Sequence, residues 1–197
     1  MSRFLESIAI VDGQIQRLHW HQRRVDQTLN AFYTGTTLDL YAAIHEHASQ
    51  HTSTVKCRVL YDDRITDVQF SRYFPREIRT LKLIESNSIE YAFKFAERAS
   101  INHLMEQRAE CDDILVVKNG LITDSSIANV VFRQGQKWFT PRQPLLKGTM
   151  REFFLENGTL TEKDIAPADL QSFDGYKLIN AMLAFAAEEY PVSNIHF

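Results

Sequence analysis

Lys94 lies in the segment YAFKFAER, residues 91–98, with a phenylalanine on each side. An ammonium group is costly to bury, so this setting has two interpretations. The lysine stem can pack on apolar surface while its amine reaches water. Alternatively, burial lowers the pKa of the amine, and the neutral amine then forms a Schiff base with a carbonyl compound. The segment alone favours the first interpretation.

Two further segments carry groups that suit a phosphate. In LLKGTMREFF, Gly148 and Thr149 stand just before a short helical pattern, where the first N–H groups lack partners within the helix and the dipole is positive. In HWHQRR, His21 and Arg24 are three residues apart on one helix face, and a guanidinium matches phosphate geometry. The alternatives are an ordinary helix cap and a solvated basic face. His19 is expected at the surface.

Polar residues with a choice of roles complete this set. Asp124 ends a strand-like run in GLITDSSIANVVF, and Asn129 follows five residues later. An aspartate there most often organises a turn, but beside a ring nitrogen it would keep that nitrogen protonated. Asn180 and Ala181 lie in the apolar stretch KLINAMLAF, where a buried amide needs core or ligand partners.

The composition indicates an ordinary soluble globular protein. The 197 residues are 44% hydrophobic and 24% charged, with a formal net charge of −3, which gives no electrostatic reason to expect nucleic-acid binding. Cys57 and Cys111 form neither a disulfide framework nor a zinc signature, so no metal site is expected. Because there is no signal-peptide pattern and no apolar run long enough to span a bilayer, we expect a cytoplasmic protein.

Turn signals and periodicity divide the first part of the chain. Two extended runs flank Asp12-Gly13, a strong hairpin signal. Apolar residues at helical spacing predict helices over 17–33 and 38–49, and alternation predicts paired strands over 56–63 and 65–74. After Pro75, residues 76–85 predict a strand, and the lysine segment is predicted to continue as a helix to about Glu110.

The rest of the chain is richer in strands. Residues 111–141 predict three strands with turns at Asn119-Gly120 and Gln134-Gly135. A loop and a short helix ending at Gly158 follow, then a capped polar helix within 160–173 and an apolar run over 176–192. The pattern predicts an α+β protein of two domains, a small N-terminal α/β domain (residues 1–76) and a larger strand-rich C-terminal domain (residues 77–197).

Taken in order, these motifs resemble the class IV aminotransferases, the fold type IV enzymes that use pyridoxal 5'-phosphate (PLP). ESIAIVDGQIQRLHWHQRRV is similar to the front of that family, whose helix carries H-x-x-R, and YAFKFAER is similar to its lysine segment. GLITDSSIANVVF resembles its G-x-[LIV]-[ST]-E-x-x-x-x-N strand end, and TPRQPLLKGTMR its T-P-x(n)-L-x-G-x-x-R loop. KLINAMLAF resembles a run seen in aminodeoxychorismate lyases. The resemblance covers most of the chain.

The resemblance implies a role for each of these residues. Lys94 would hold PLP as a Schiff base and move the proton at the substrate Cα, and Asp124 would pair with the pyridine nitrogen. Phosphate binding would fall to Arg24, Gly148 and Thr149, with Asn180 and Ala181 close by. Ser125, Ser126 and Asn129 would shape the floor of the cofactor site. The implied fold is a pseudo-barrel domain and a smaller domain with PLP between them, in a homodimer.

The sequence departs from the family pattern at two places. The family carboxylate is normally Glu, and Asp124 is one methylene shorter. Family members usually carry a leading strand and loop before the E-x-I run, whereas this chain starts almost at that run. The resemblance is therefore to an abbreviated member, whose substrate pocket is expected to be smaller, more open or completed by another subunit.

Arg98 and the Asn180-Ala181 run favour an aminodeoxychorismate-lyase-like β-elimination that releases pyruvate and 4-aminobenzoate. The alternatives are transamination between an amino acid and a 2-oxo acid, PLP binding without turnover, and a binding module without PLP. Arg98 can also make a helix-surface ion pair with a neighbour such as Glu97. A small-molecule substrate carboxylate needs a cation, and the sequence does not rank the candidates Arg58, Arg64, Arg72 and Arg142.

Overall fold

The computed structural model describes residues 2–183, 185 and 187–197, and the chain divides into two compact units. Unit 1 comprises residues 1–75 and 93–97, and unit 2 comprises residues 76–92 and 98–197. The observed boundary lies beside the one expected after residue 76. The expectation of one continuous second domain is not met, because Phe93–Glu97 belongs to unit 1 although the chain on both sides of it belongs to unit 2.

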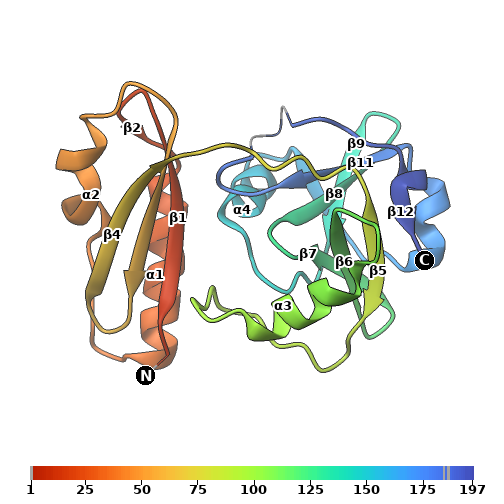
Figure 1. Ribbon diagram of the computed structural model, residues 1–197, viewed down its shortest axis with the longest axis horizontal. Helices are drawn as coiled ribbons and strands as arrows, with labels where there is room; N and C mark the ends of the chain where they lie inside the picture. Colours follow the sequence, from red (N-terminus) through yellow and green to blue (C-terminus); the bar gives the residue numbers. More distant parts are fainter. Residues whose placement is uncertain (1, 184, 186) are drawn as a thin grey trace. The chain divides into compact units, whose positions relative to one another are not determined.

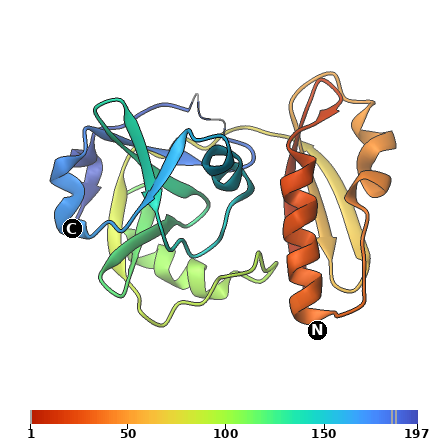
Figure 2. The ribbon, with the colours of Figure 1, turned by 180° about the vertical axis from the view of Figure 1, so that it is seen from behind.

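Unit 1 is a four-stranded antiparallel sheet with two helices on one face (Figures 1 and 2). Its strands run in the order β2-β1-β3-β4 and are β1 (Phe4–Val11), β2 (Gln14–Ile15), β3 (Val55–Tyr61) and β4 (Ile65–Arg72). The helices are α1 (Leu18–Phe32) and α2 (Leu40–Ala48). All four strands and both helices lie where the sequence patterns predict them.

The hairpin that opens unit 1 depends on a turn that few residues can make. Asp12 and Gly13 both have positive φ angles, 47° and 76°, which is the type I′ geometry that matches the strand twist. Beyond the turn, alternate residues of β1 point into one core. Val25 and Leu29 of α1 and Ile44 of α2 pack with Ile8 and Cys57 of the sheet in one buried cluster. Both helices therefore cover the same sheet face.

Unit 2 is built around an eight-stranded mixed sheet (Figure 1). The strand order is β10-β9-β8-β7-β6-β5-β12, and β11 pairs with β8. The strands are β5 (Leu81–Glu85), β6 (Asp113–Lys118), β7 (Leu121–Ser125), β8 (Asn129–Gln134), β9 (Lys137–Pro141), β10 (Leu160–Lys163), β11 (Gly175–Ile179) and β12 (Ile195–His196). Two α-helices, α3 (Ala99–Met105) and α4 (Thr149–Glu156), and three short 3-10 helices complete it, η1 (Glu106–Arg108), η2 (Pro167–Ser172) and η3 (Val192–Asn194).

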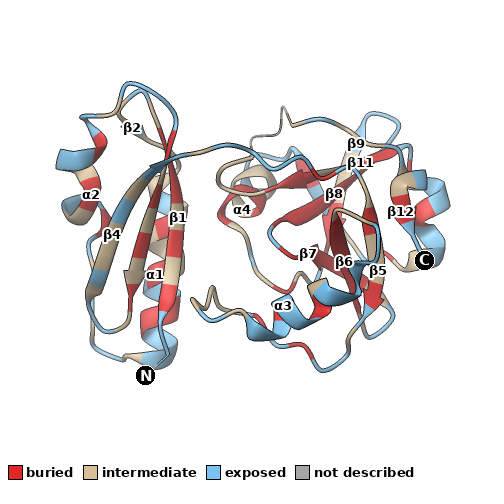
Figure 3. Ribbon diagram, in the orientation of Figure 1, coloured by how far each residue is buried: buried red, intermediate tan, exposed pale blue. Residues whose placement is uncertain are grey.

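The central strands of unit 2 form its core. β6 and β8 are buried almost along their whole length, as Figure 3 shows, and Leu115, Val130 and Phe132 are fully buried. A run this apolar suits a strand covered on both faces. The α+β class predicted from the sequence is confirmed.

Three local predictions are wrong, and two of them concern unit 2. Residues 111–141 form four strands instead of three, because a turn at residues 126–128 divides β7 from β8. Residues 160–173 contain strand β10 and the 3-10 helix η2 in place of one helix, since β10 pairs in parallel with β9. The third error concerns the lysine segment and is described below. The apolar run over 176–192 includes residues 184 and 186, which lie outside the described residues.

Candidate functional site

The segment that carries Lys94 is not helical, contrary to the sequence prediction, and is instead attached to the edge of β1. The backbone N–H of Leu5 donates to the carbonyl of Lys94 (3.0 Å), and the N–H of Ala96 donates to the carbonyl of Arg3 (2.8 Å). Phe4 and Phe95 form an antiparallel bridge. The predicted helix begins only at Ala99. These contacts hold the lysine backbone to unit 1.

The two phenylalanines beside Lys94 explain this attachment. Phe95 lies 5.1 Å from the ring of Phe4, and Phe93 lies 4.9 Å from the ring of Phe32, measured between centroids. The N–H of Phe95 donates to the carbonyl of Phe93 (2.9 Å), so the chain makes a tight turn centred on Lys94, and both phenylalanines pack on the aromatic cluster of unit 1. Lys94 is half-buried, and its positive charge helps to lower the pKa of His21.

Arg24 and His21 are both held by one buried carboxylate, that of Glu6 on β1. The guanidinium of Arg24 donates from Nε to Oε1 of Glu6 (2.8 Å) and from Nη2 to Oε2 (2.6 Å). Nδ1 of His21 lies 2.5 Å from Oε2 and donates to it. His19, by contrast, is exposed, as predicted.

The protonation of this cluster follows from its contacts. Burial alone would raise the pKa of Glu6, but the Arg24 charge and the hydrogen bonds from His21 and Arg24 outweigh it and lower the pKa to about 2. Burial lowers the pKa of His21, although its hydrogen bond to Glu6 acts in the opposite direction. Glu6 is therefore a carboxylate, and Arg24 is its main counter-charge.

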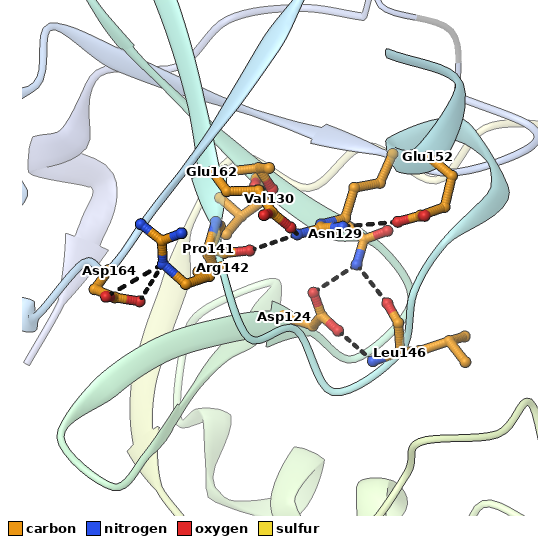
Figure 4. A network of polar contacts seen from close by, with 11 residues as sticks. Asp124, Asn129, Val130, Pro141, Arg142, Leu146, Glu152, Glu162 and Asp164 are labelled. Atoms are coloured by element: carbon orange, nitrogen blue, oxygen red, sulfur yellow. Dashed lines mark hydrogen bonds and ion pairs between the residues drawn. The ribbon is translucent and has the colours of Figure 1, made fainter. Parts of the chain in front are cut away.

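In unit 2, Asp124 and Asn129 face each other across the β7–β8 pair (Figure 4). Nδ2 of Asn129 donates both to Oδ1 of Asp124 (2.7 Å) and to the carbonyl of Leu146 (2.9 Å). The backbone N–H of Leu146 donates to Oδ2 of Asp124 (2.9 Å). Burial raises the pKa of Asp124 to about 6, against the opposing effect of these bonds and of the Arg151 charge. Asp124 is thus a buried carboxyl group whose pKa lies close to neutral pH.

Gly148 and Thr149 lie at the start of α4, as the sequence predicts. Gly148 has an ordinary φ of −70°, so its backbone conformation does not require glycine. Space does: a Cβ atom there would lie 2.0 Å from Oδ1 of Asn129. The missing side chain lets the Leu146–Gly148 loop approach the Asp124–Asn129 pair closely, and Thr149 is buried beside it.

Arg151, the last residue of the loop motif TPRQPLLKGTMR, is the largest fully buried side chain of the chain as described, and the sequence analysis gave it no role. Its Nη2 donates to the carbonyl of Pro141 (2.9 Å) and to Glu162 (2.6 Å), and its Nη1 donates to Glu152 (2.7 Å). These bonds tie the first turn of α4 to the ends of β9 and β10. Arg151 therefore supports the loop that carries Gly148 and Thr149.

Three side chains form hydrogen bonds to the backbone of the turn after Asp124. Within it, Oγ of Ser125 accepts from the N–H of Ala128 (3.1 Å). The guanidinium of Arg98 donates to the carbonyl of Ser126, and Nδ2 of Asn180 donates to the carbonyl of Ile127 (3.2 Å). Two residues that favoured a lyase, Arg98 and Asn180, thus converge on one turn.

The remaining sequence candidates differ in their settings. Oδ1 of Asn180 accepts from the N–H groups of Met182 and Leu183 (both 2.9 Å), which shapes the loop around Ala181. Arg142 is exposed and pairs with Asp164 (3.2 Å). The other three arginines lie on or near β3 and β4 in unit 1 and are half-buried or exposed: Arg58, Arg64 and Arg72.

Glu6, the first residue of the E-x-I run, was also given no role, although the sequence carries a signal for one. Phe4, Ile8 and Ile10 occupy the inward face of β1 at every second position, and Glu6 falls in the same series. A carboxylate on the buried face of a strand needs a compensating charge, which predicts a cationic partner on the helix packed there.

In the described part of the chain, no helix is long and apolar enough to cross a membrane. No group of three or more His, Cys, Asp or Glu side chains among these residues could hold a metal ion.

Comparison with known proteins identifies the class of protein that this fold and these residues define. The family model for amino-transferase class IV matches residues 3–195, and the chain belongs to that family. It is 37% identical over 185 residues to a protein of Haemophilus influenzae, covering 92% of this chain and 98% of that one. Over 68 residues it is 37% identical to a protein of Schizosaccharomyces pombe provisionally named aminodeoxychorismate lyase, covering 33% of this chain and 29% of that protein.

Solved structures agree with this assignment. A crystal structure from Haemophilus somnus 129PT, provisionally titled 4-amino-4-deoxychorismate lyase, superposes with a TM-score of 0.86 at 33% identity and covers 94% of this chain and 98% of that one. A PLP-bound structure from Mycobacterium tuberculosis, titled a hypothetical aminotransferase, has a TM-score of 0.79 at 16% identity. The match covers 98% of this chain and 81% of that one. The family resemblance drawn from the sequence is confirmed.

Proposed function

We propose that the protein is a PLP-dependent enzyme of amino-acid metabolism that carries its cofactor on Lys94. One observation carries the proposal: the short segment Phe93–Glu97 returns to unit 1, so that Lys94 and Arg24 belong to the same compact unit. The packing of Phe93 and Phe95 thereby brings a half-buried amine into the unit that holds the Arg24 guanidinium. Family membership and the PLP-bound M. tuberculosis relative support the choice of cofactor.

The residues in each unit fit the chemical groups of PLP. In unit 1, Lys94 supplies an amine, and Arg24 supplies a guanidinium of fixed orientation. In unit 2, Gly148 permits close backbone approach at the N-terminus of α4, a setting that favours anions. The same unit holds Asp124, a buried carboxylate whose raised pKa would fall again beside a cationic ring nitrogen.

Each residue then has a defined task. When bound, PLP supplies an electron sink for the negative charge that develops at the substrate Cα. Lys94 is the acid–base group that moves the proton at that carbon. Asp124 keeps the ring nitrogen protonated, and Asn129 orients Asp124. Ser125 ends β7, and Ser126 begins the turn that follows.

On the family resemblance, we propose phosphate-binding roles for Arg24 and for the start of α4. Arg24 provides the cation, and the start of α4 at Gly148 and Thr149 provides backbone donors. Asn180 and Ala181 lie in a loop of the same unit as Gly148, and Asn180 also supports the turn at Ile127. Each of these roles predicts weaker cofactor binding when the residue is replaced.

For the reaction, we favour β-elimination from aminodeoxychorismate, which releases pyruvate and 4-aminobenzoate. The support is the likeness to the H. somnus and S. pombe proteins, together with the Arg98 and Asn180 contacts at one turn. Transamination between an amino acid and a 2-oxo acid is the alternative, because many fold relatives carry that name. A homodimer and a cytoplasmic location complete the proposal, on the family resemblance and the two free cysteines.

The first experiment is a visible absorption titration of the purified protein with PLP. Wild type and Lys137→Ala, which removes an exposed lysine on β9, should develop a visible band that is shifted from the band of free PLP. Lys94→Ala should develop none while keeping the wild-type circular dichroism spectrum. A band of wild-type intensity in a folded Lys94→Ala protein would reject Lys94 as the cofactor lysine.

A second assay separates the reactions. Aminodeoxychorismate is added to the PLP-loaded protein, and pyruvate is followed with lactate dehydrogenase. Pyruvate release from this substrate, but no amino transfer to 2-oxo acids from a panel of L- and D-amino acids, is the expected result. Amino transfer without pyruvate release would make the protein an aminotransferase. A cofactor band that no substrate changes would favour a PLP-binding protein without turnover.

A further inference from the structure

Glu6 is a fully buried carboxylate that the proposed reaction does not use. It occupies a position on β1 between Phe4 and Ile8 that faces the apolar core of unit 1. Taking a carboxylate out of water costs free energy unless a charge and hydrogen bonds compensate. A charged residue at position 6 therefore needs a reason other than burial of apolar surface.

The contacts of Glu6 point to α1. Its two oxygens accept two hydrogen bonds from Arg24 and one from His21, at 2.8, 2.6 and 2.5 Å. His21 and Arg24 are three residues apart and therefore lie on the same helix face. One carboxylate thus holds two side chains of one helical turn.

Stability alone does not account for this cluster. Replacing a buried ion pair by well-packed apolar side chains is often neutral or stabilising, and Ile8 and Ile10 on the same face of β1 dock the helices without any charge. What the ion pair adds is direction, because a two-point contact with a planar guanidinium sets its plane.

Exposure distinguishes the three members. The side chains of Glu6 and His21 are 0% exposed, whereas that of Arg24 is 11% exposed. Arg24 is therefore the one member of the cluster whose side chain reaches the surface of unit 1, and the two buried members hold it there. This is the arrangement expected when a recognition group is supported from behind.

We infer that Glu6 is a positioning residue for phosphate recognition by Arg24, and that His21 holds the Glu6 carboxylate in place. The inference rests on the proposed role of Arg24. A guanidinium held in one orientation pays less conformational entropy when the phosphate binds than a mobile side chain does. Glu6 itself does not contact the ligand and does not take part in the reaction.

The test measures binding of PLP and of pyridoxal, which lacks the phosphate, to the apoprotein by absorbance or quenching of protein fluorescence. The ratio of the pyridoxal Kd to the PLP Kd isolates the contribution of the phosphate. Four proteins are compared: wild type, Glu6→Gln, Arg24→Ala and the double variant. Glu6→Gln keeps the size of the side chain and removes its charge. Circular dichroism and thermal unfolding establish that each protein is folded.

We expect Glu6→Gln to reduce the ratio by about tenfold to hundredfold, as when a group that orients a ligating residue is removed, with the pyridoxal Kd unchanged. In the Arg24→Ala background, Glu6→Gln should change the ratio no further. Equal weakening of PLP and pyridoxal, or the same effect with and without Arg24, would overturn the inference. A ratio unaffected by Arg24→Ala would instead reject the phosphate role of Arg24 itself.

A second pair of variants keeps the test decisive should Glu6→Gln not fold. His21→Asn retains a donor near the position of Nδ1, whereas His21→Leu removes it. The ratio should be close to wild type in His21→Asn and reduced in His21→Leu. The same ratio in both folded variants would contradict the role given to His21.

Discussion

Gly148 allows the central arrangement of unit 2 to be tested by adding a single methyl group. In Gly148→Ala the new Cβ atom would lie 2.0 Å from Oδ1 of Asn129 and 3.2 Å from its Cγ, so the amide must move. The backbone itself raises no objection, because φ is −70°. The cost therefore arises from Asn129.

The magnitude follows from the bonds that Asn129 would lose. Its amide donates to the Asp124 carboxylate and to the Leu146 carbonyl. A hydrogen bond to a charged group contributes about 1.5–3 kcal/mol and a neutral one about 0.5–1.5 kcal/mol. Gly148→Ala should thus lower the free energy of unfolding by about 2–4 kcal/mol and weaken PLP binding.

A double-variant cycle in urea unfolding checks this reasoning. Asn129→Ala removes both the bonds and the obstructing oxygen, so Gly148→Ala should cost little when added to it. The three atoms nearest the added Cβ all belong to the Asn129 side chain, the third being Nδ2 at 3.8 Å. Equal destabilisation by Gly148→Ala in the wild-type and Asn129→Ala backgrounds would refute the account.

Three further predictions concern unit 2. In urea unfolding, Arg151→Met should lower the free energy of unfolding by about 2–3 kcal/mol. This is less than the about 3–5 kcal/mol lost when a fully buried ion pair is broken, because the partner carboxylates of Arg151 are partly exposed. An unchanged free energy of unfolding would contradict the supporting role of Arg151. Burial raises the folded-state pKa of Asp124 to about 6, so the folded apoprotein holds a proton that the unfolded chain releases near pH 4. The contribution of Asp124 to stability should therefore fall by about 3 kcal/mol as the pH rises from about 3 to about 7, and the slope should disappear in Asp124→Asn. Arg98→Met removes the donor to the Ser126 carbonyl and should reduce thermal stability modestly, with a larger loss of pyruvate release than of PLP affinity; unchanged release would separate Arg98 from the reaction.

Local signals predicted most of unit 1. The Asp12-Gly13 turn and the helical spacing of Val25 and Leu29 act within a few residues, and the structure follows them. The lysine segment departed from prediction because its conformation depends on Phe4 and Phe32, which lie far away in sequence. No local pattern in YAFKFAER carries that information.

In unit 2, the secondary structure of some segments depends on pairing with strands that are distant in sequence, which a local sequence pattern does not reveal. Strand β10 exists because it pairs with β9, and its own residues read equally well as a capped helix. The turn that divides β7 from β8 depends on the Ser125 hydroxyl, with support from Arg98 and Asn180. The partners of a buried charge such as Arg151 lie on other strands, so they become evident only in the folded structure.

The measurement that tests the central claim most directly is chemical labelling of the cofactor lysine. The PLP-loaded protein is reduced with sodium borohydride, digested, and analysed by peptide mass spectrometry. The account predicts a phosphopyridoxyl group on Lys94 in wild type and none at any lysine of Lys94→Ala. A label at another lysine, or its persistence in Lys94→Ala, would contradict the account.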